Sequence, residues 1–310
     1  MTRASPTMAR AARLVLALLA STGAVAGYLA GGARSWGTIV GAGLGAVLVA
    51  IAIAVGLTYA VAGTQARSVP AAHRARVGSR LLAVLREFLA HVAVFTALMP
   101  FERLWVRDRV QRGAGSGTAP VLLVHGYLLN GAAWWRFARL VEREGFRAHT
   151  VTVGPPLGSI DAMVASLARR IEEICAAAGT PQVHLVAHSM GGLVCRAYLR
   201  AHGAGRVARL VTIGSPHHGT AVARLGIGRC AREMTPGSPW LAALAESERG
   251  APHPLTVALF SYYDNYITPP ESSMLPWARN EALPALGHVE MYFSRRVAAR
   301  VCAALRATGA

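Results

Sequence analysis

A serine between a predicted strand and a predicted helix is the first candidate for chemistry. Residues 187–192 read AHSMGG and follow the apolar run VHLV, so Ser189 lies where a buried strand ends. A nucleophile on such a turn needs small residues two positions before and two after it, so that strand and helix can approach. Ala187 and Gly191 meet this need, although glycine is usual at the first position. The pattern favours a nucleophilic serine over an ordinary small-residue turn.

A nucleophilic serine needs a base, and the base needs an acid that orients it. For a serine on a strand-to-helix turn, the acid and then the histidine follow later in the chain. After Ser189 the sequence has one aspartate, Asp264, and after Asp264 it has one histidine, His288. We therefore predict these three as nucleophile, acid and base. Glu271 is the alternative acid, and we prefer Asp264 because aspartate is commoner in this role.

The anion that forms on an attacked carbonyl needs two preorganised backbone N–H donors. The amide of Met190, directly after the serine, is expected to supply one. The loop VHGYLLN follows the first predicted strand, and the amide of Tyr127 within it is expected to supply the other. We expect His125 to support the shape of this loop by hydrogen bonding.

Four other histidines lie near these segments. His188 adjoins the serine, but neighbours in a tight turn point apart, so we expect it to pack rather than to react. His184 alternates with apolar residues in a predicted strand and is expected to be structural. His217 and His218 follow a strand end at GSPHHGT. They either line a substrate pocket, for which His218 is our candidate, or belong to a turn fixed by the flanking proline and glycine.

Alternating strands and helices are expected to hold these residues. Apolar strand-like runs lie at 119–126, 147–153, 181–188, 207–214 and 254–263, and helical patterns at 132–145, 159–178, 191–202 and 293–307. This alternation predicts an α/β fold with a parallel sheet covered on both faces. Asp264 and His288 would then lie at the carboxyl ends of strands, where sites in open α/β sheets are assembled.

Residues 219–254 depart from this alternation and are expected to form a cap or insert over the site. Its apolar side chains are candidates for the wall of an acyl-chain pocket, namely Met234, Trp240, Leu241 and Leu244. Ordinary core packing is the equally plausible alternative for these side chains.

Two charge-free segments at about 14–32 and 38–62 are each long enough to cross a bilayer core of about 30 Å. We predict two transmembrane helices within an anchor of residues 1–66. Arginines flank both outer ends, which predicts a multi-pass protein of the bacterial inner membrane with everything downstream in the cytoplasm. The alternative is a cleaved signal peptide ending near Ala24-Val25-Ala26, with the second segment as the anchor.

Residues 67–118 connect this anchor to the predicted catalytic domain at 119–310. The stretch 72–99 is largely apolar but contains Arg86, Glu87 and His91. These charges favour an interfacial or domain-packing helix over a third span. The glycine- and serine-rich run at 111–120 predicts a linker.

The composition narrows the function classes. Hydrophobic residues make up 53% and charged residues 15% of the chain, which favours a membrane protein with a soluble part. The net charge of +17 comes entirely from arginine, and no run of five basic residues occurs, so we do not expect nucleic-acid binding. The excess charge favours contact with anionic lipid. The four cysteines lack CxxC spacing and are expected to be buried free thiols.

Five segments in this order resemble the bacterial lipase and esterase branch of the α/β-hydrolase superfamily over residues 119–306: VLLVHGYLLN, HLVAHSMGGLVCRAYL, LVTIGSPHHGT, YYDNYITPPES and GHVEMYFSRRV. The resemblance implies a reduced, mostly parallel sheet of about six strands. It implies the roles of nucleophile, acid, base and two oxyanion donors for Ser189, Asp264, His288, Tyr127 and Met190, respectively. No metal or organic cofactor is expected. Some relatives carry a structural calcium, which the three aspartates of this chain do not favour.

The expected function is therefore that of a membrane-anchored lipase or esterase that forms an acyl-enzyme on a lipid or other hydrophobic ester. Acyl transfer by the same residues and a catalytically inactive, hydrolase-like membrane scaffold are the alternatives. The sequence leaves the acyl chain length and the oligomeric state open.

Overall fold

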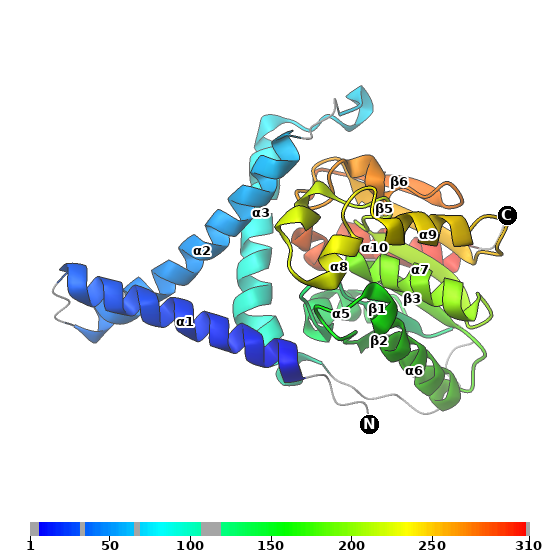
Figure 1. Ribbon diagram of the computed structural model, residues 1–310, viewed down its shortest axis with the longest axis horizontal. Helices are drawn as coiled ribbons and strands as arrows, with labels where there is room; N and C mark the ends of the chain where they lie inside the picture. The colour runs from blue at the N-terminus through cyan, green and yellow to red at the C-terminus, as the bar shows by residue number, and fades with distance from the viewer. Residues whose placement is uncertain (1–5, 32–34, 65–68, 107–118, 308–310) are drawn as a thin grey trace.

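The computed structural model has a helical N-terminal part and a layered α/β part (Figure 1). It describes residues 6–31, 35–64, 69–106 and 119–307. The loop between the first two helices and most of the predicted linker at 111–120 lie outside this description.

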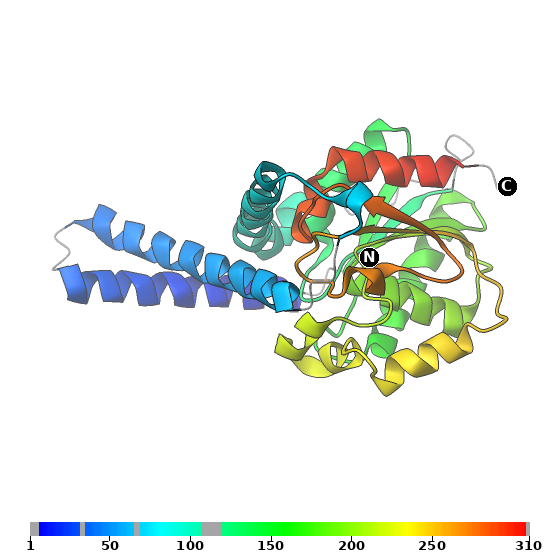
Figure 2. The same cartoon turned by 90° about the horizontal axis from the view of Figure 1, so that it is seen from above.

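The first two helices form a hairpin that projects away from the α/β part (Figures 1 and 2). They are α1 (Pro6–Gly31) and α2 (Trp36–Thr64). By length and composition alone, three stretches are apolar enough to cross a membrane, namely Thr7–Leu29, Trp36–Thr64 and Val77–Trp105. The first two overlap the segments that the sequence predicts as spans.

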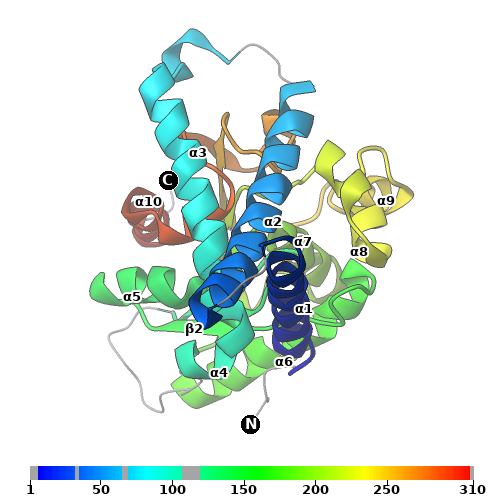
Figure 3. The same cartoon turned by 90° about the vertical axis from the view of Figure 1, so that its left-hand side faces the viewer.

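The third stretch packs along the α/β part through both apolar and polar residues. It consists of α3 (Val77–Val92), the π-helical segment η2 (Ala93–Leu98), the 3-10 turn η3 (Met99–Phe101) and α4 (Glu102–Trp105). Glu87 and His91 are buried, whereas Leu81, Leu85 and Leu89 are exposed. Glu87 and His91 therefore face the protein, whereas Arg86 and the leucines are exposed. Viewed from the side of the hairpin, α1, α2 and α3 lie in front of the α/β part (Figure 3).

The α/β part is built on one parallel sheet of six strands in the order β2-β1-β3-β4-β5-β6. The strands are β1 (Val121–Val124), β2 (Ala148–Val151), β3 (Val183–His188), β4 (Val207–Ile213), β5 (Leu255–Ser261) and β6 (Arg279–Leu283). The predicted α/β fold with a parallel sheet of about six strands is confirmed. No strand is predicted from the sequence at β6, whose first residues are polar and exposed at the edge of the sheet.

Helices cover both faces of the sheet (Figure 2). One face packs against α5 (Trp135–Arg143) and α10 (Arg295–Arg306), and the other against α6 (Ile160–Ala178) and α7 (Met190–His202). Local signals in the sequence explain the bounds of α6. The hydroxyl of Ser159 accepts from the amide of Asp161 at its start, and Gly179 adopts a left-handed conformation at its end.

The predicted cap region contains η5 (Ala221–Leu225), α8 (Gly228–Glu233) and α9 (Pro239–Ser247). Its buried Glu233 accepts hydrogen bonds from the Ser159 hydroxyl at 2.8 Å and from the Ile160 amide at 2.7 Å. A carboxylate at the first amides of α6 stabilises the start of that helix. The insert is thus joined firmly to the sheet-covering helices. All four cysteines are buried free thiols, as predicted.

The core between α6 and the sheet should be sensitive to loss of volume. Leu167 is fully buried there. We expect Leu167→Ala to lower the free energy of unfolding by about 2–5 kcal/mol, because it removes buried apolar contacts and leaves a cavity. Leu255→Ala, at a half-exposed position, should cost far less. Denaturant unfolding of both variants in the same detergent would test this, and equal losses would contradict it.

Candidate active site

Ser189 lies on a strained turn between β3 and α7. Its backbone has φ 56° and ψ −131°. Positive φ is unfavourable for a residue with a side chain and persists only where the surrounding structure imposes it. The backbone N–H of Ser189 donates to the carbonyl of Ile213 at 2.9 Å, which ties the turn to the end of β4. The serine thus occupies the strand-to-helix junction that the sequence predicts.

Gly191 permits the close approach of α7 to the neighbouring strand. A Cβ at this position would lie 2.6 Å from the carbonyl oxygen of Val124 and 2.7 Å from that of His125. Both atoms belong to the backbone and cannot move aside cheaply. This contact is the reason why the residue two positions after the serine must be small.

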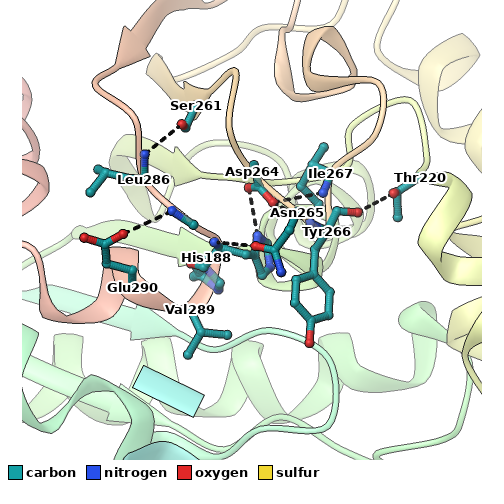
Figure 4. Close-up of polar contacts among 12 residues, drawn as sticks. His188, Thr220, Ser261, Asp264, Asn265, Tyr266, Ile267, Leu286, Val289 and Glu290 are labelled. Atoms are coloured by element: carbon teal, nitrogen blue, oxygen red, sulfur yellow. Dashed lines mark hydrogen bonds and ion pairs between the residues drawn. The ribbon is translucent and has the colours of Figure 1, made fainter. Parts of the chain in front are cut away.

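Asp264 and His288 form a buried hydrogen-bonded pair. The Nδ1–H of His288 donates to Oδ2 of Asp264 at 2.8 Å. The other carboxylate oxygen, Oδ1, accepts from the amides of Tyr266 at 2.8 Å and Ile267 at 3.0 Å (Figure 4). The three donors orient the carboxylate. Asp264, and not the alternative Glu271, is therefore the carboxylate that contacts the histidine.

The backbone and ring of His288 are also held in place. Its amide donates to Oδ1 of Asn265 at 3.1 Å, and its carbonyl accepts from Nε2 of His188 at 3.0 Å. Its ring stacks on that of Tyr266 with centroids 4.8 Å apart. Because Nδ1 carries the proton shared with Asp264, the neutral ring has its lone pair on Nε2. That nitrogen is the one able to accept a proton.

His188 links the serine turn to the histidine loop. It directly precedes Ser189, it donates to the backbone of His288, and the two rings are 4.4 Å apart. Ser189 follows β3, Asp264 follows β5 and His288 follows β6, so all three lie beyond the carboxyl ends of strands of one sheet. The contact between His288 and Asp264 is present, and the contact of Ser189 with His288 stays a prediction. The sequence predicts that His188 packs, and in the structure it packs against the loop of His288.

The two predicted oxyanion donors lie at suitable places. Met190 is the first residue of α7, and the first amides of a helix have no acceptor within the helix. Tyr127 follows β1 in a loop where Leu128 has φ 54°. The Tyr127 hydroxyl donates to the carbonyl of Ile227 at 2.7 Å and accepts from its amide at 2.8 Å. The loop is therefore tied to the insert, and the predicted role of the two amides remains a prediction.

His125 supports the shape of the same loop, as the sequence predicts. Its Nδ1–H donates to the carbonyl of Gly126 at 2.8 Å, and its Nε2 accepts from the amide of Val153 at 3.0 Å. Burial lowers the pKa of His125 to about 4. Burial also lowers the pKa values of His188 and His217 well below the usual range. These histidines are neutral packing groups at physiological pH.

The predicted substrate-binding residues of the insert contact α6 and α7. Met234, Leu241 and Leu244 belong to the core cluster around α6 and α7. Trp240 donates from its indole N–H to Asp161 at 3.1 Å. Packing and this hydrogen bond are sufficient to explain why these side chains lie where they do. Their role in lining a substrate pocket stays a prediction.

His218, the remaining substrate-binding candidate, is exposed. Its Nε2 lies 3.1 Å from the carbonyl of Met274 and its amide donates to the carbonyl of Ser272, so these contacts fix the turn. This arrangement fits the alternative that His218 belongs to a fixed turn. A contact of His218 with substrate stays a prediction.

Sequence reasoning missed three residues: Asn265 and Glu87 contact the histidine loop, and Thr58 contacts Asn265. Asn265 follows the predicted acid, but nothing in the sequence distinguishes its amide from that of any polar loop residue. Thr58 and Glu87 lie in the N-terminal helices, more than 200 positions from His288. A glutamate within an apolar helix was a signal of burial against protein, but it did not identify the partner.

Comparison with known proteins agrees with this fold. Residues 119–229 match a family described as alpha/beta hydrolase fold. The mature lipase of Bacillus licheniformis aligns with a TM-score of 0.55 at 19% identity, covering 63% of this chain and 94% of that chain. Lipase B of Aspergillus fumigatus aligns with a TM-score of 0.56 at 16% identity, covering 67% of this chain and 57% of that chain.

The phospholipase PlaB of Legionella pneumophila aligns with a TM-score of 0.53 at 13% identity, covering 62% of this chain and 60% of that chain. This chain therefore spans less than two thirds of the lengths of lipase B and of this phospholipase. At such identities the likeness shows the fold.

The close approach at Gly191 gives a test of the serine turn. Gly191→Ala should lower the unfolding temperature markedly, because the added methyl group would lie within 2.7 Å of two backbone oxygens. Gly205→Ala is the matched control, since a Cβ there would meet nothing within 4 Å. Thermal unfolding of both variants would decide, and similar unfolding temperatures for the two would contradict the prediction.

The buried histidines predict a dependence of stability on pH. The pKa of His125 is about 4 in the folded protein and about 6.5 when unfolded. Between these values the unfolded chain binds a proton that the folded chain does not, so stability falls as pH falls, by up to roughly 1.4 kcal/mol per pH unit. His125→Gln should show a shallower decline in unfolding temperature from pH 6.5 to 4.5. Parallel curves for variant and wild type would refute this assignment.

Proposed function

We propose that this chain, which has the α/β-hydrolase fold, is a membrane-anchored serine hydrolase that cleaves carboxylic esters. The observation that carries the proposal is the buried hydrogen bond of 2.8 Å between His288 and Asp264 at the same sheet edge as the strained Ser189. Three residues in the order serine, aspartate, histidine on this fold match the requirements of acyl-transfer chemistry.

In the proposed reaction, the hydroxyl oxygen of Ser189 attacks the ester carbonyl while Nε2 of His288 takes the hydroxyl proton. Asp264 stabilises the imidazolium that forms and keeps the ring oriented. The imidazolium then gives its proton to the leaving alcohol, which departs as the carbonyl reforms in the acyl-enzyme. Water, deprotonated by the same histidine, attacks the acyl-enzyme and releases the carboxylic acid and the serine.

The negative charge on the carbonyl oxygen is stabilised by two backbone amides. In the proposal these are the amides of Met190, at the start of α7, and Tyr127, in the loop after β1. Each such donor contributes roughly 3–4 kcal/mol to the transition state in serine hydrolases. The bonds from the Tyr127 hydroxyl to Ile227 support this role, because they hold the loop without using its amide.

Two apolar helices of sufficient length support anchoring in a membrane. Arginines before the apolar segment at 14–32 and after the segment at 38–62 favour an orientation with both ends, and hence the α/β part, on the cytoplasmic side of the bacterial inner membrane. A site held next to a bilayer favours hydrophobic esters as substrates. The sequence also suggests four residues that would contact the acyl chain in this proposal, namely His218, Met234, Trp240 and Leu241.

The nucleophile can be tested directly. Purified full-length protein should react with a fluorophosphonate probe, which forms a covalent bond with an activated serine, and Ser189→Ala should abolish the labelling. Failure of the folded wild type to react would favour the inactive-scaffold alternative.

The choice of acid can be tested by measuring ester hydrolysis. Asp264→Asn should lower kcat on p-nitrophenyl butyrate by about 10⁴-fold, because the imidazole loses its oriented tautomer. Glu271→Gln, at the alternative acid, is the matched control and should leave kcat unchanged. A larger loss in the Glu271 variant than in the Asp264 variant would overturn the assignment.

A further inference from the structure

Two helices outside the α/β part contact the loops that carry Asp264 and His288. The first contact comes from Glu87 of α3, whose side chain is completely buried. Its Oε1 accepts from the amide of Val289 at 3.0 Å, and its Oε2 accepts from the amide of Glu290 at 2.8 Å. These amides directly follow His288 and begin the 3-10 turn η7 (Val289–Phe293), part of which is drawn in Figure 4.

The carboxylate of Glu87 also packs against the residue before His288. A Cβ at Gly287 would lie 2.5 Å from Oε2 of Glu87 and 2.7 Å from its Cβ. Glu87 therefore touches the chain on both sides of the histidine. Two consecutive backbone N–H groups donate to this buried carboxyl group, and it would be left unsatisfied if it lost them.

The second contact comes from Thr58 near the end of α2. Its hydroxyl oxygen accepts from Nδ2 of Asn265 at 2.7 Å, and the hydroxyl donates to the carbonyl of Val55 at 2.8 Å. The other end of the same amide group, Oδ1 of Asn265, accepts from the amide of His288 at 3.1 Å. The asparagine is thus a bridge from an apolar helix to the backbone of the histidine.

A third contact acts on the ring of His288. Nδ1–H of His91 donates to the carbonyl of Glu87 at 2.8 Å, so its Nε2 accepts from the hydroxyl of Tyr266 at 2.9 Å. The ring of Tyr266 stacks on the ring of His288. The ring, the amide and the following turn of His288 are therefore each supported by residues that lead to α2 or α3.

We propose that Glu87 and Thr58 are positioning residues for His288, so that the apolar helices α2 and α3 complete the active site of the α/β part. This inference rests on the proposed function, because it assigns the residues a part in the reactivity of the proposed base. A purely structural role would lower stability without a selective effect on turnover.

The Glu87 contact is tested by Glu87→Gln in the full-length protein in detergent. Glutamine keeps the volume but replaces one accepting oxygen with an amino group that faces a backbone N–H. We expect kcat on p-nitrophenyl butyrate to fall by roughly 10- to 100-fold with KM unchanged, because displacement of a catalytic group by about 1 Å has effects of this size. Glu246→Gln, at an exposed glutamate, is the matched control.

The Thr58 contact is tested by Thr58→Val, which keeps the branched shape and removes the acceptor for Asn265. We expect a smaller fall in kcat, again without a change in KM. Thr64→Val is the matched control, because the hydroxyl of Thr64 donates to a carbonyl of the same helix and is exposed. If Glu87→Gln does not fold, the comparison of Thr58→Val with Thr64→Val decides.

Labelling by the fluorophosphonate probe separates failure of this inference from failure of the proposed function. An unreactive wild type would overturn the proposed function and this inference with it. A reactive wild type, with Glu87→Gln and Thr58→Val labelled at the wild-type rate and showing the wild-type kcat, would overturn this inference alone. Slower labelling and lower kcat in folded variants, with normal controls, would support it.

Discussion

The hydrogen bond between Nδ1 of His288 and Oδ2 of Asp264 is the interaction on which the site depends. It is buried, and it sets both the tautomer and the direction of the imidazole ring. Neither residue lies in a regular strand or helix, so their geometry relies on neighbouring contacts. Amides after Asp264 hold the carboxylate, and Asn265 and His188 hold the backbone of His288.

Buried carboxylates recur where the N-terminal helices and the insert meet the sheet. Glu87 accepts from two amides of the histidine loop, and Glu233 accepts at the start of α6. Glu102 of α4 accepts from the amide of Gly131 at 3.1 Å and from the hydroxyl of Thr152 at 2.6 Å. Each accepts at least one backbone N–H, which offsets part of the cost of burying a polar group. Such contacts make the helices part of one packed unit.

Helix α3 has a polar contact with the site on one face and an apolar surface on the other. On α3, Glu87 and His91 face the histidine loop, while Leu81, Leu85 and Leu89 are exposed. In the proposed membrane-anchored enzyme, such an apolar outer face suits contact with lipid. The same helix then touches the bilayer on one side and supports the catalytic base on the other. In that proposal, α2 and α3 contact the loops that carry the proposed acid and base.

The sequence by itself determined the parallel α/β architecture, because buried strands and amphipathic helices leave periodic apolar patterns, and it located the serine turn, because that turn requires small residues. It also predicted Asp264 and His288 through their order along the chain. It did not predict β6, whose polar edge residues lack an apolar pattern. Only the tertiary structure decided between Asp264 and Glu271 as the histidine's partner, and only it brought Glu87 to the histidine loop and Thr58 to Asn265. Contacts across some 200 residues depend on how helices pack in space, and no local pattern encodes that packing.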